Sequence, residues 1–174
     1  MVQQTDVLIL GCGISGCSTA LALAERGVSV TLVSSSRDLT RSNSYWGQGG
    51  IIFSGKEDSP DLLTKDLMEA GAGLCNQRAV EQLVQLGPQY VDEVLIKFLG
   101  VDFDRTEGGD LALTEEAAHS CPRILHHRDQ TGSVILDAML QKLQSYPDVQ
   151  ILGDHTAVDL ITLSHHSTRL TDIY

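Results

Sequence analysis

Basic residues are scarce in this chain of 174 residues. Twelve lysines and arginines face 23 aspartates and glutamates, which gives a formal net charge of −11 with histidines neutral. This balance disfavours nucleic acids and membrane surfaces as partners, because both carry negative charge. Long apolar runs are also missing: no stretch approaches the roughly 18 apolar residues of a membrane-spanning helix, and no basic segment precedes an apolar run at the N-terminus. We therefore expect a soluble cytoplasmic protein.

Paired metal-binding motifs are missing as well. No two of the four cysteines, at positions 12, 17, 75 and 121, form the C-x-x-C pair of zinc or redox sites. The histidines at 119, 126, 127, 165 and 166 have neither an H-x-x-x-H spacing on a clear helix nor an accompanying cysteine pair. We expect free thiols in a reducing compartment and no metal site.

The chain does contain alternating strand and helix patterns, over a length that suits one domain. Residues 6–10 (DVLIL) have the pattern of a strand buried on both faces, and a helical apolar surface then runs to Gly27. Residues 28–33 have the β-branched alternation of a second strand. This βαβ unit predicts a parallel sheet, to which strands at 149–152 and 157–163 are expected to return.

The middle of the chain has helical patterns over 59–71, 76–86 and 88–100, and another follows Gly132. Gly87-Pro88 is expected to end one helix and to start the next. The turn-rich EGGD at 107–110 is expected to join strands at 101–103 and 111–113 in a small hairpin. Side-chain oxygens of Asp129 and Thr131 are expected to cap the helix near Gly132.

Gly11, Gly13 and Gly16 form G-x-G-x-x-G at the junction of the first strand and the first helix. In this context the first glycine permits a tight turn, the second allows backbone to approach a pyrophosphate, and the third permits close helix packing. The alternative is a glycine-rich turn that binds nothing. The flanking strand and helix favour a dinucleotide site, with N–H donors at the helix N-terminus.

The second strand ends in three serines, Ser34, Ser35 and Ser36, where nicotinamide-binding proteins place an acid for the ribose hydroxyls. Ordinary NAD use therefore loses support, and serine hydroxyls are the available ribose partners. Arg37 could indicate the 2′-phosphate of NADP, although a single loop arginine is more often merely solvated. The stretch SNSYWGQGG at 42–50 suits close backbone approach to a flat ligand, and a mobile surface loop is an equal alternative.

Four segments together carry a family resemblance: DVLILGCGISG, SNSYWGQGG, EAGAGLCNQRAVE and LTEEAAHSCPRILHHRDQTG. From Asp6 to about Ile161 the chain resembles the N-terminal part of the L-aspartate oxidases, flavoenzymes of the succinate dehydrogenase and fumarate reductase flavoprotein superfamily. The patterns at 70–81 and 123–126 resemble aspartate oxidases in particular. The resemblance implies an α/β, Rossmann-like FAD-binding fold with a parallel sheet and flanking helices, incomplete relative to the full family fold.

The resemblance implies FAD as cofactor, with contacts carried over position by position. The pyrophosphate is expected at Gly11, Cys12, Gly13, Ile14, Ser15 and Gly16, and the adenosine ribose at Ser34 and Ser35. Aspartate oxidases often have serine at the first of these two positions, but frequently lysine at the second. The ribityl chain and isoalloxazine are expected along Asn43, Ser44, Tyr45, Trp46, Gly47, Gln48, Gly49 and Gly50, and the adenine near the backbone of Ala157.

Asn43 stands where succinate dehydrogenases carry the histidine that bonds their flavin covalently. An amide cannot form that bond, so we expect FAD to be held non-covalently. Glu116 aligns with a glutamate that aspartate oxidases place near the substrate. There a carboxylate would attract the α-ammonium group of aspartate and repel succinate. Without the resemblance, a solvated glutamate beside Glu115 would be the favoured interpretation.

The activity implied by the resemblance is oxidation of L-aspartate to iminoaspartate, with oxygen or fumarate as electron acceptor. Quinolinate synthase then uses the product in NAD biosynthesis. Residues 1–174 correspond to the N-terminal portion of the FAD-binding domain, and the family's capping domain, helical C-terminal domain and catalytic arginine would lie beyond Tyr174. The isolated chain is therefore expected to bind FAD weakly and to be inactive. Two alternatives stay open: a fumarate reductase or succinate dehydrogenase-like flavoprotein, and a non-catalytic dinucleotide-binding module.

Overall fold

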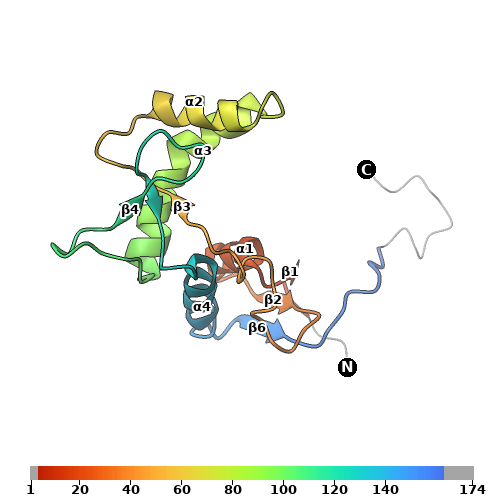
Figure 1. Ribbon diagram of the computed structural model, residues 1–174. Helices are drawn as coiled ribbons and strands as arrows, with labels where there is room; N and C mark the ends of the chain where they lie inside the picture. Colours follow the sequence, from red (N-terminus) through yellow and green to blue (C-terminus); the bar gives the residue numbers. More distant parts are fainter. Residues whose placement is uncertain (1–3, 163–174) are drawn as a thin grey trace.

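A parallel sheet forms around the first βαβ unit in the computed structural model, which describes residues 4–162. Strand β1 (Val7–Leu10) leads through helix α1 (Ile14–Ala24) to β2 (Val30–Val33), and β1 and β2 pair in parallel. Strand β6 (Val149–Leu152) pairs in parallel with the other edge of β2, giving the order β1-β2-β6 (Figure 1). The predicted parallel sheet and the return of 149–152 are confirmed.

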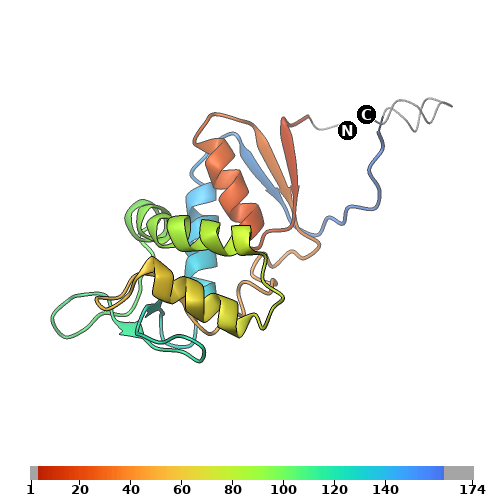
Figure 2. The same cartoon turned by 90° about the horizontal axis from the view of Figure 1, so that it is seen from above.

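Two helices cover one face of this sheet, α1 and α4 (Thr131–Leu143), which pack against each other (Figure 2). Small residues such as Cys17 and Ala20 are fully buried on α1, so the helix lies close to its neighbours. Leu32 of β2 and Leu136 of α4 are fully buried in the same core. Each such leucine contributes about 1.5–3 kcal/mol relative to an exposed position.

The opposite face of the sheet is open at β1 within the described residues. Leu8 and Leu10 of β1 are 54% and 62% exposed, because they point away from α1 and α4. The prediction of a strand buried on both faces is therefore wrong for the part of the chain that the structure describes.

The middle of the chain forms a second group of elements beside the parallel sheet (Figure 1). It comprises helices α2 (Pro60–Ala70) and α3 (Gln77–Tyr90), the π-helix η1 (Val91–Phe98), and strands β3 (Ile51–Ile52), β4 (Leu113–Thr114) and β5 (Ile124–Leu125). The short strands form an antiparallel sheet in the order β3-β5-β4. Two of these helices begin at side-chain caps: Ser59 Oγ accepts from the Leu62 amide, and Asn76 Oδ1 accepts from the Ala79 amide, both at 3.1 Å.

The expected break at Gly87-Pro88 is wrong, because α3 runs through Pro88 to Tyr90. Proline removes one N–H donor from a helix interior. Val84 and Val91, on either side of it, are both buried, and this burial offsets the loss. The chain then widens into η1, where the Leu99 amide bonds the Val94 carbonyl five residues back.

Three further predictions differ from the structure. The hairpin reduces to a bridge between Arg105 and Leu111; residues 101–103 form no strand, and β4 pairs with β5 instead. The predicted cap by Asp129 and Thr131 is wrong: α4 has Gln130 as its N-cap without a side-chain bond, and Thr131 Oγ1 accepts from the His127 amide instead. Residues 157–162 form no strand, and Leu163, His165 and His166 lie outside the described residues.

No helix within residues 4–162 is both long and apolar enough to span a membrane. The four cysteines are free thiols, as expected. Within the same range, no group of three or more histidines, cysteines and acids is arranged to hold a metal ion.

Candidate functional site

The glycine-rich turn joins β1 to α1 in a geometry that needs its glycines. The Gly11 amide donates to the Val33 carbonyl at 2.8 Å, and its φ of +104° lies in a region that side chains disfavour. A Cβ built on Gly16 would lie 2.1 Å from the Gly11 carbonyl oxygen. The strand end and the helix start therefore approach more closely than any other residue at position 16 would permit.

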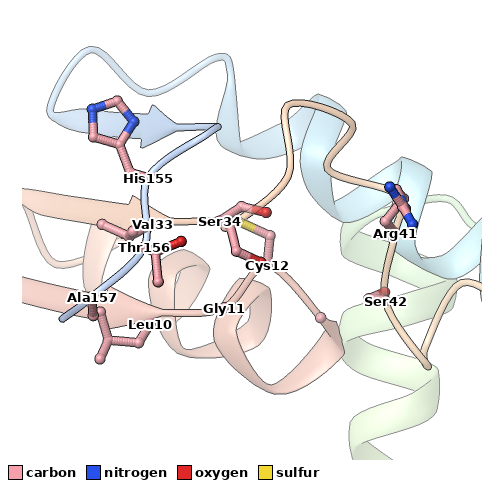
Figure 3. A pocket seen from close by; sticks show the side chains of 12 residues that line it. Leu10, Gly11, Cys12, Val33, Ser34, Arg41, Ser42, His155, Thr156 and Ala157 are labelled. Atoms are coloured by element: carbon pink, nitrogen blue, oxygen red, sulfur yellow. The ribbon is translucent and has the colours of Figure 1, made fainter.

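A cavity of about 270 Å³ opens beside this turn, where the carboxyl ends of β1 and β2 meet the segment after β6 (Figure 3). Ligands of open α/β sheets bind in crevices at this end of the strands. The structure brings six of the predicted cofactor residues together there: Gly11, Cys12, Gly13, Ser34, Ser35 and Ala157. The predicted neighbours Ile14, Ser15 and Gly16 do not line the cavity, because they belong to α1.

Sequence reasoning missed Arg41, His155 and Thr156, which also line the cavity, together with Ser42, the first residue of the predicted 42–50 stretch. The His155 amide donates to the Ser34 carbonyl at 2.9 Å, so the segment after β6 is fixed across the end of β2. Arg41 gives the cavity a cation in a chain with few of them (Figure 3). The sequence signal that could have indicated Arg41 is its position directly before the SNSYWGQGG stretch. A cation beside the glycine-rich turn that leads into a helix N-terminus suits a bound anion.

Residues 43–50 do not line this cavity. They follow directly in the chain after Arg41 and Ser42, which do line it. Ser44 Oγ accepts a hydrogen bond from the Ile14 amide at 3.1 Å, so it caps α1 from a distance of 30 positions in the sequence. A Cβ on Gly50 would lie 2.1 Å from the Ile124 side chain. Tyr45 and Trp46 meet edge to face with ring centroids 5.4 Å apart, and Trp46 is 71% exposed.

Glu116 reaches this segment from the loop between β4 and β5. A Cβ built on Gly49 would lie 3.5 Å from Glu116 Oε2, so the carboxylate stands beside the backbone of Gly49. The Glu116 carbonyl accepts from the His119 amide at 3.0 Å, which closes a turn. The structure thus brings the predicted substrate residue to residues 43–50.

Cys12 of the glycine turn and Cys17 of α1 both have raised pKa values. Burial raises the pKa of Cys12, and burial followed by the nearby Cys12 raises the pKa of Cys17 to about 12. Cys17 Sγ donates to the Cys12 carbonyl at 3.3 Å. Because thiolates are the reactive form, neither side chain is suited to act as a nucleophile here.

Comparison with known proteins identifies relatives of the whole described region. Residues 6–171 match the FAD binding domain family. The L-aspartate oxidase of Halobacterium salinarum is 43% identical over 158 residues, which cover 91% of this chain and 30% of that protein. The L-aspartate oxidase of Synechocystis is 42% identical over 159 residues, covering 91% of this chain and 28% of that protein. The chain thus spans less than a third of the length of these curated relatives.

Solved structures share the fold. The Mycobacterium smegmatis Sdh1 complex in the apo form is similar with a TM-score of 0.78 at 26% identity, over 86% of this chain and 27% of that chain. A mutant of Escherichia coli quinol fumarate reductase FrdA is similar with a TM-score of 0.82 at 24% identity, over 90% of this chain and 27% of that chain. The predicted α/β fold with a parallel sheet and flanking helices is confirmed.

Proposed function

The chain belongs to the FAD binding domain family, and we propose that it forms the cofactor-binding part of an L-aspartate oxidase. FAD, the predicted cofactor, is confirmed by this family match.

The cavity fits the phosphate end of a dinucleotide. Its walls combine the glycine-rich turn, which ends in Gly13, the N-cap of α1, with Arg41, and both a helix N-terminus and an arginine favour negative charge. We assign the pyrophosphate to residues 11–16, the adenosine ribose to Ser34 and Ser35, and the adenine to the backbone near Ala157. Residues 43–50 continue from this cavity toward Glu116, which supports assigning the ribityl chain and the isoalloxazine to them.

The position of Glu116 beside Gly49 carries the choice of substrate. FAD, when bound, supplies the oxidant that accepts a hydride from the substrate α-carbon. The carboxylate of Glu116 attracts the α-ammonium group of L-aspartate and repels a dicarboxylate that lacks one, such as succinate. Holding the ammonium group also orients the α-carbon relative to residues 43–50.

The remaining parts of the proposal follow the same enzyme class. Oxygen or fumarate serves as electron acceptor, and quinolinate synthase uses the iminoaspartate product for NAD biosynthesis. The four free cysteines support a reducing compartment, which we take to be the cytoplasm. Residues 1–174 form the N-terminal portion of the FAD-binding domain, and the other substrate-binding groups come from outside these residues. Asn43, an amide, leaves FAD held non-covalently.

The decisive experiment compares two neighbouring acids in the FAD-loaded enzyme that contains this chain. Glu116→Gln is expected to lower the ratio of kcat/KM for L-aspartate over succinate by on the order of tenfold, since it removes one charge interaction. Glu115→Gln is the matched control and is expected to leave the ratio unchanged. An unchanged ratio in Glu116→Gln would overturn the assigned role.

Two other functions predict different outcomes. A fumarate reductase or succinate dehydrogenase-like flavoprotein would turn over succinate but not aspartate. The similarity to FrdA concerns the fold and does not favour this alternative activity. A non-catalytic dinucleotide-binding module would turn over neither substrate, even when loaded with FAD.

A further inference from the structure

Arg123, at the start of β5, is the largest fully buried side chain in the described residues, at 0% exposure. Its guanidinium forms two ion pairs, with Asp58 Oδ1 and with Asp66 Oδ2, each at 2.9 Å. Asp66 lies on α2 and is itself buried. A buried charge needs partners of this kind, because removing one of them leaves the other without solvation.

Asp66 also holds the loop that precedes Arg123. Its Oδ2 accepts from the Ser120 amide at 2.9 Å, and its Oδ1 accepts from the Ser120 hydroxyl. Arg123 in turn donates to Cys121 Sγ at 3.1 Å and lies 3.4 Å from His119 Nδ1. One buried carboxylate and one buried guanidinium therefore fix residues 119–123 against α2.

The cluster keeps its charges. The hydrogen bonds from Ser120 and the charge of Arg123 hold the pKa of Asp66 below its ordinary value. Burial lowers the pKa of Arg123, but the bond to Cys121 and the nearby charges of Asp58 and Asp66 outweigh it, so that its pKa is raised. At neutral pH the pair is thus an ion pair, with directional bonds to both of its carboxylate oxygens.

The fixed segment is continuous with the turn that carries Glu116. The His119 amide donates to the Glu116 carbonyl, and Ala118 has a φ of +73°, a left-handed conformation that few non-glycine residues adopt. Such a conformation persists only where the surrounding structure imposes it. The two hydrogen bonds that Ser120, two residues later, donates to Asp66 supply that constraint.

We propose that Asp66 and Arg123 are positioning residues, which set the specificity for the amino group of the substrate by holding the Glu116 turn beside Gly49. This role rests on the proposed function of Glu116. Neither side chain is placed in contact with substrate or cofactor. They act through their contacts with Ser120 and His119.

The test uses three variants of the FAD-loaded enzyme that contains this chain. Ser120→Ala removes the hydroxyl bond to Asp66, Asp66→Asn removes the charge, and Asp61→Asn changes an exposed acid on the same helix as a control. For Ser120→Ala and Asp66→Asn we expect the KM for L-aspartate to rise on the order of tenfold, with kcat and the KM for succinate changed less than about twofold. Asp61→Asn and the affinity for FAD are expected to stay unchanged.

A second measurement reports on the loop without turnover. Amide hydrogen exchange at His119 and Ser120 is expected to accelerate in Ser120→Ala and Asp66→Asn, but not in Asp61→Asn. If Asp66 and Arg123 only stabilised the fold, the variants would have a lower kcat and a lower free energy of unfolding, and the KM values for L-aspartate and succinate would change equally. If Asp66→Asn does not fold, Ser120→Ala decides the matter.

Failure of the positioning role and failure of the proposed function give different results. If Glu116→Gln alters the aspartate-to-succinate ratio while folded Ser120→Ala and Asp66→Asn do not, the positioning role is overturned and the proposed function survives. If Glu116→Gln leaves the ratio unchanged, the proposed function fails, and the positioning role fails with it.

Discussion

The Gly132 amide donates a hydrogen bond of 2.8 Å to the Gly47 carbonyl, which joins the start of α4 to residues 43–50. The contact is close on both sides, since a Cβ built on Gly132 would lie 2.0 Å from the Ser44 carbonyl oxygen and 2.8 Å from that of Gly47. Both obstacles are backbone atoms, which cannot rotate away. Helix α4 therefore supports the segment assigned to the flavin ring.

Gly132→Ala is expected to displace Ser44 and Gly47, because the added methyl group has no space. The overpacking should lower the free energy of unfolding by about 1–3 kcal/mol and weaken FAD binding by at least about tenfold. Urea unfolding followed by circular dichroism measures the first effect, and titration with FAD followed by fluorescence measures the second.

Gly87→Ala is the matched control for this substitution. Gly87 lies within α3, and the nearest atoms to an added Cβ are Leu83 side-chain carbons at 3.8 and 3.9 Å. Alanine is favoured over glycine in a helix interior by about 0.5–1 kcal/mol, so this variant should be more stable and should bind FAD normally. Equal FAD affinity in Gly132→Ala and Gly87→Ala would contradict the supporting role of α4.

The environment of Asp104 predicts that the free energy of unfolding falls in acid. Its Oδ2 accepts from the Arg128 amide at 2.8 Å and lies 3.1 Å from His126 Nδ1, and these contacts, the amide bond first, lower the pKa of Asp104. A carboxylate with a lowered pKa in the folded state stabilises the fold above its ordinary pKa of about 3.9. That stabilisation is lost as the pH falls through the lower, folded value.

Asp104→Asn should therefore be less stable than the parent chain at pH 6, and the difference should shrink as the pH falls below about 4. Urea unfolding at several pH values from 6 to 3 measures it. Asp110→Asn, an exposed acid of the same region, should run parallel to the parent. A constant difference between Asp104→Asn and the parent across this range would show that the ionised form is not the stabilising one.

Cys17 and Cys75 are expected to react with iodoacetamide at different rates. Cys17 is fully buried with a pKa raised to about 12, whereas Cys75 is only partly buried. At pH 8 a thiol of pKa 12 is ionised to about one part in ten thousand, so iodoacetamide should modify Cys75 at least about a hundredfold faster. Mass spectrometry of peptides after timed labelling gives both rates. All four cysteines should react alike in urea, and comparable native rates for Cys17 and Cys75 would contradict the buried geometry.

Local patterns predicted the start of the fold because local chemistry decides it. Strand β1, the glycine turn and α1 follow from an apolar run, three glycines and a helical stripe, and Ser59 and Asn76 cap helices as their residue types favour. The predictions for Pro88 and Thr131 were wrong because contacts outside the local pattern decide the structure there. Buried valines around Pro88 keep α3 intact, and the hydroxyl of Thr131 is used by the His127 amide, which no helix-cap pattern reveals.

The candidate site was predictable only in part. Composition and spacing indicated a dinucleotide, and the resemblance supplied Glu116, but the contact of its carboxylate with Gly49 joins distant parts of the chain. The ion pair of Asp66 with Arg123 spans 57 positions. A buried arginine runs against the usual exposure of that residue type, so no sequence pattern indicated it.

The two faces of the parallel sheet predict unequal costs for two similar substitutions. Leu8 and Leu32 lie on opposite faces, because Leu8 pairs with Thr31 and side chains alternate along a strand. Leu32→Ala removes a fully buried side chain under α1 and α4 and should cost about 2–5 kcal/mol. Leu8→Ala changes a side chain that is more than half exposed and should cost less than about 1 kcal/mol. Urea unfolding of both variants of this chain measures the difference. Equal costs would mean that the open face is covered in solution, and sedimentation analysis would then show whether a second copy of the chain covers it.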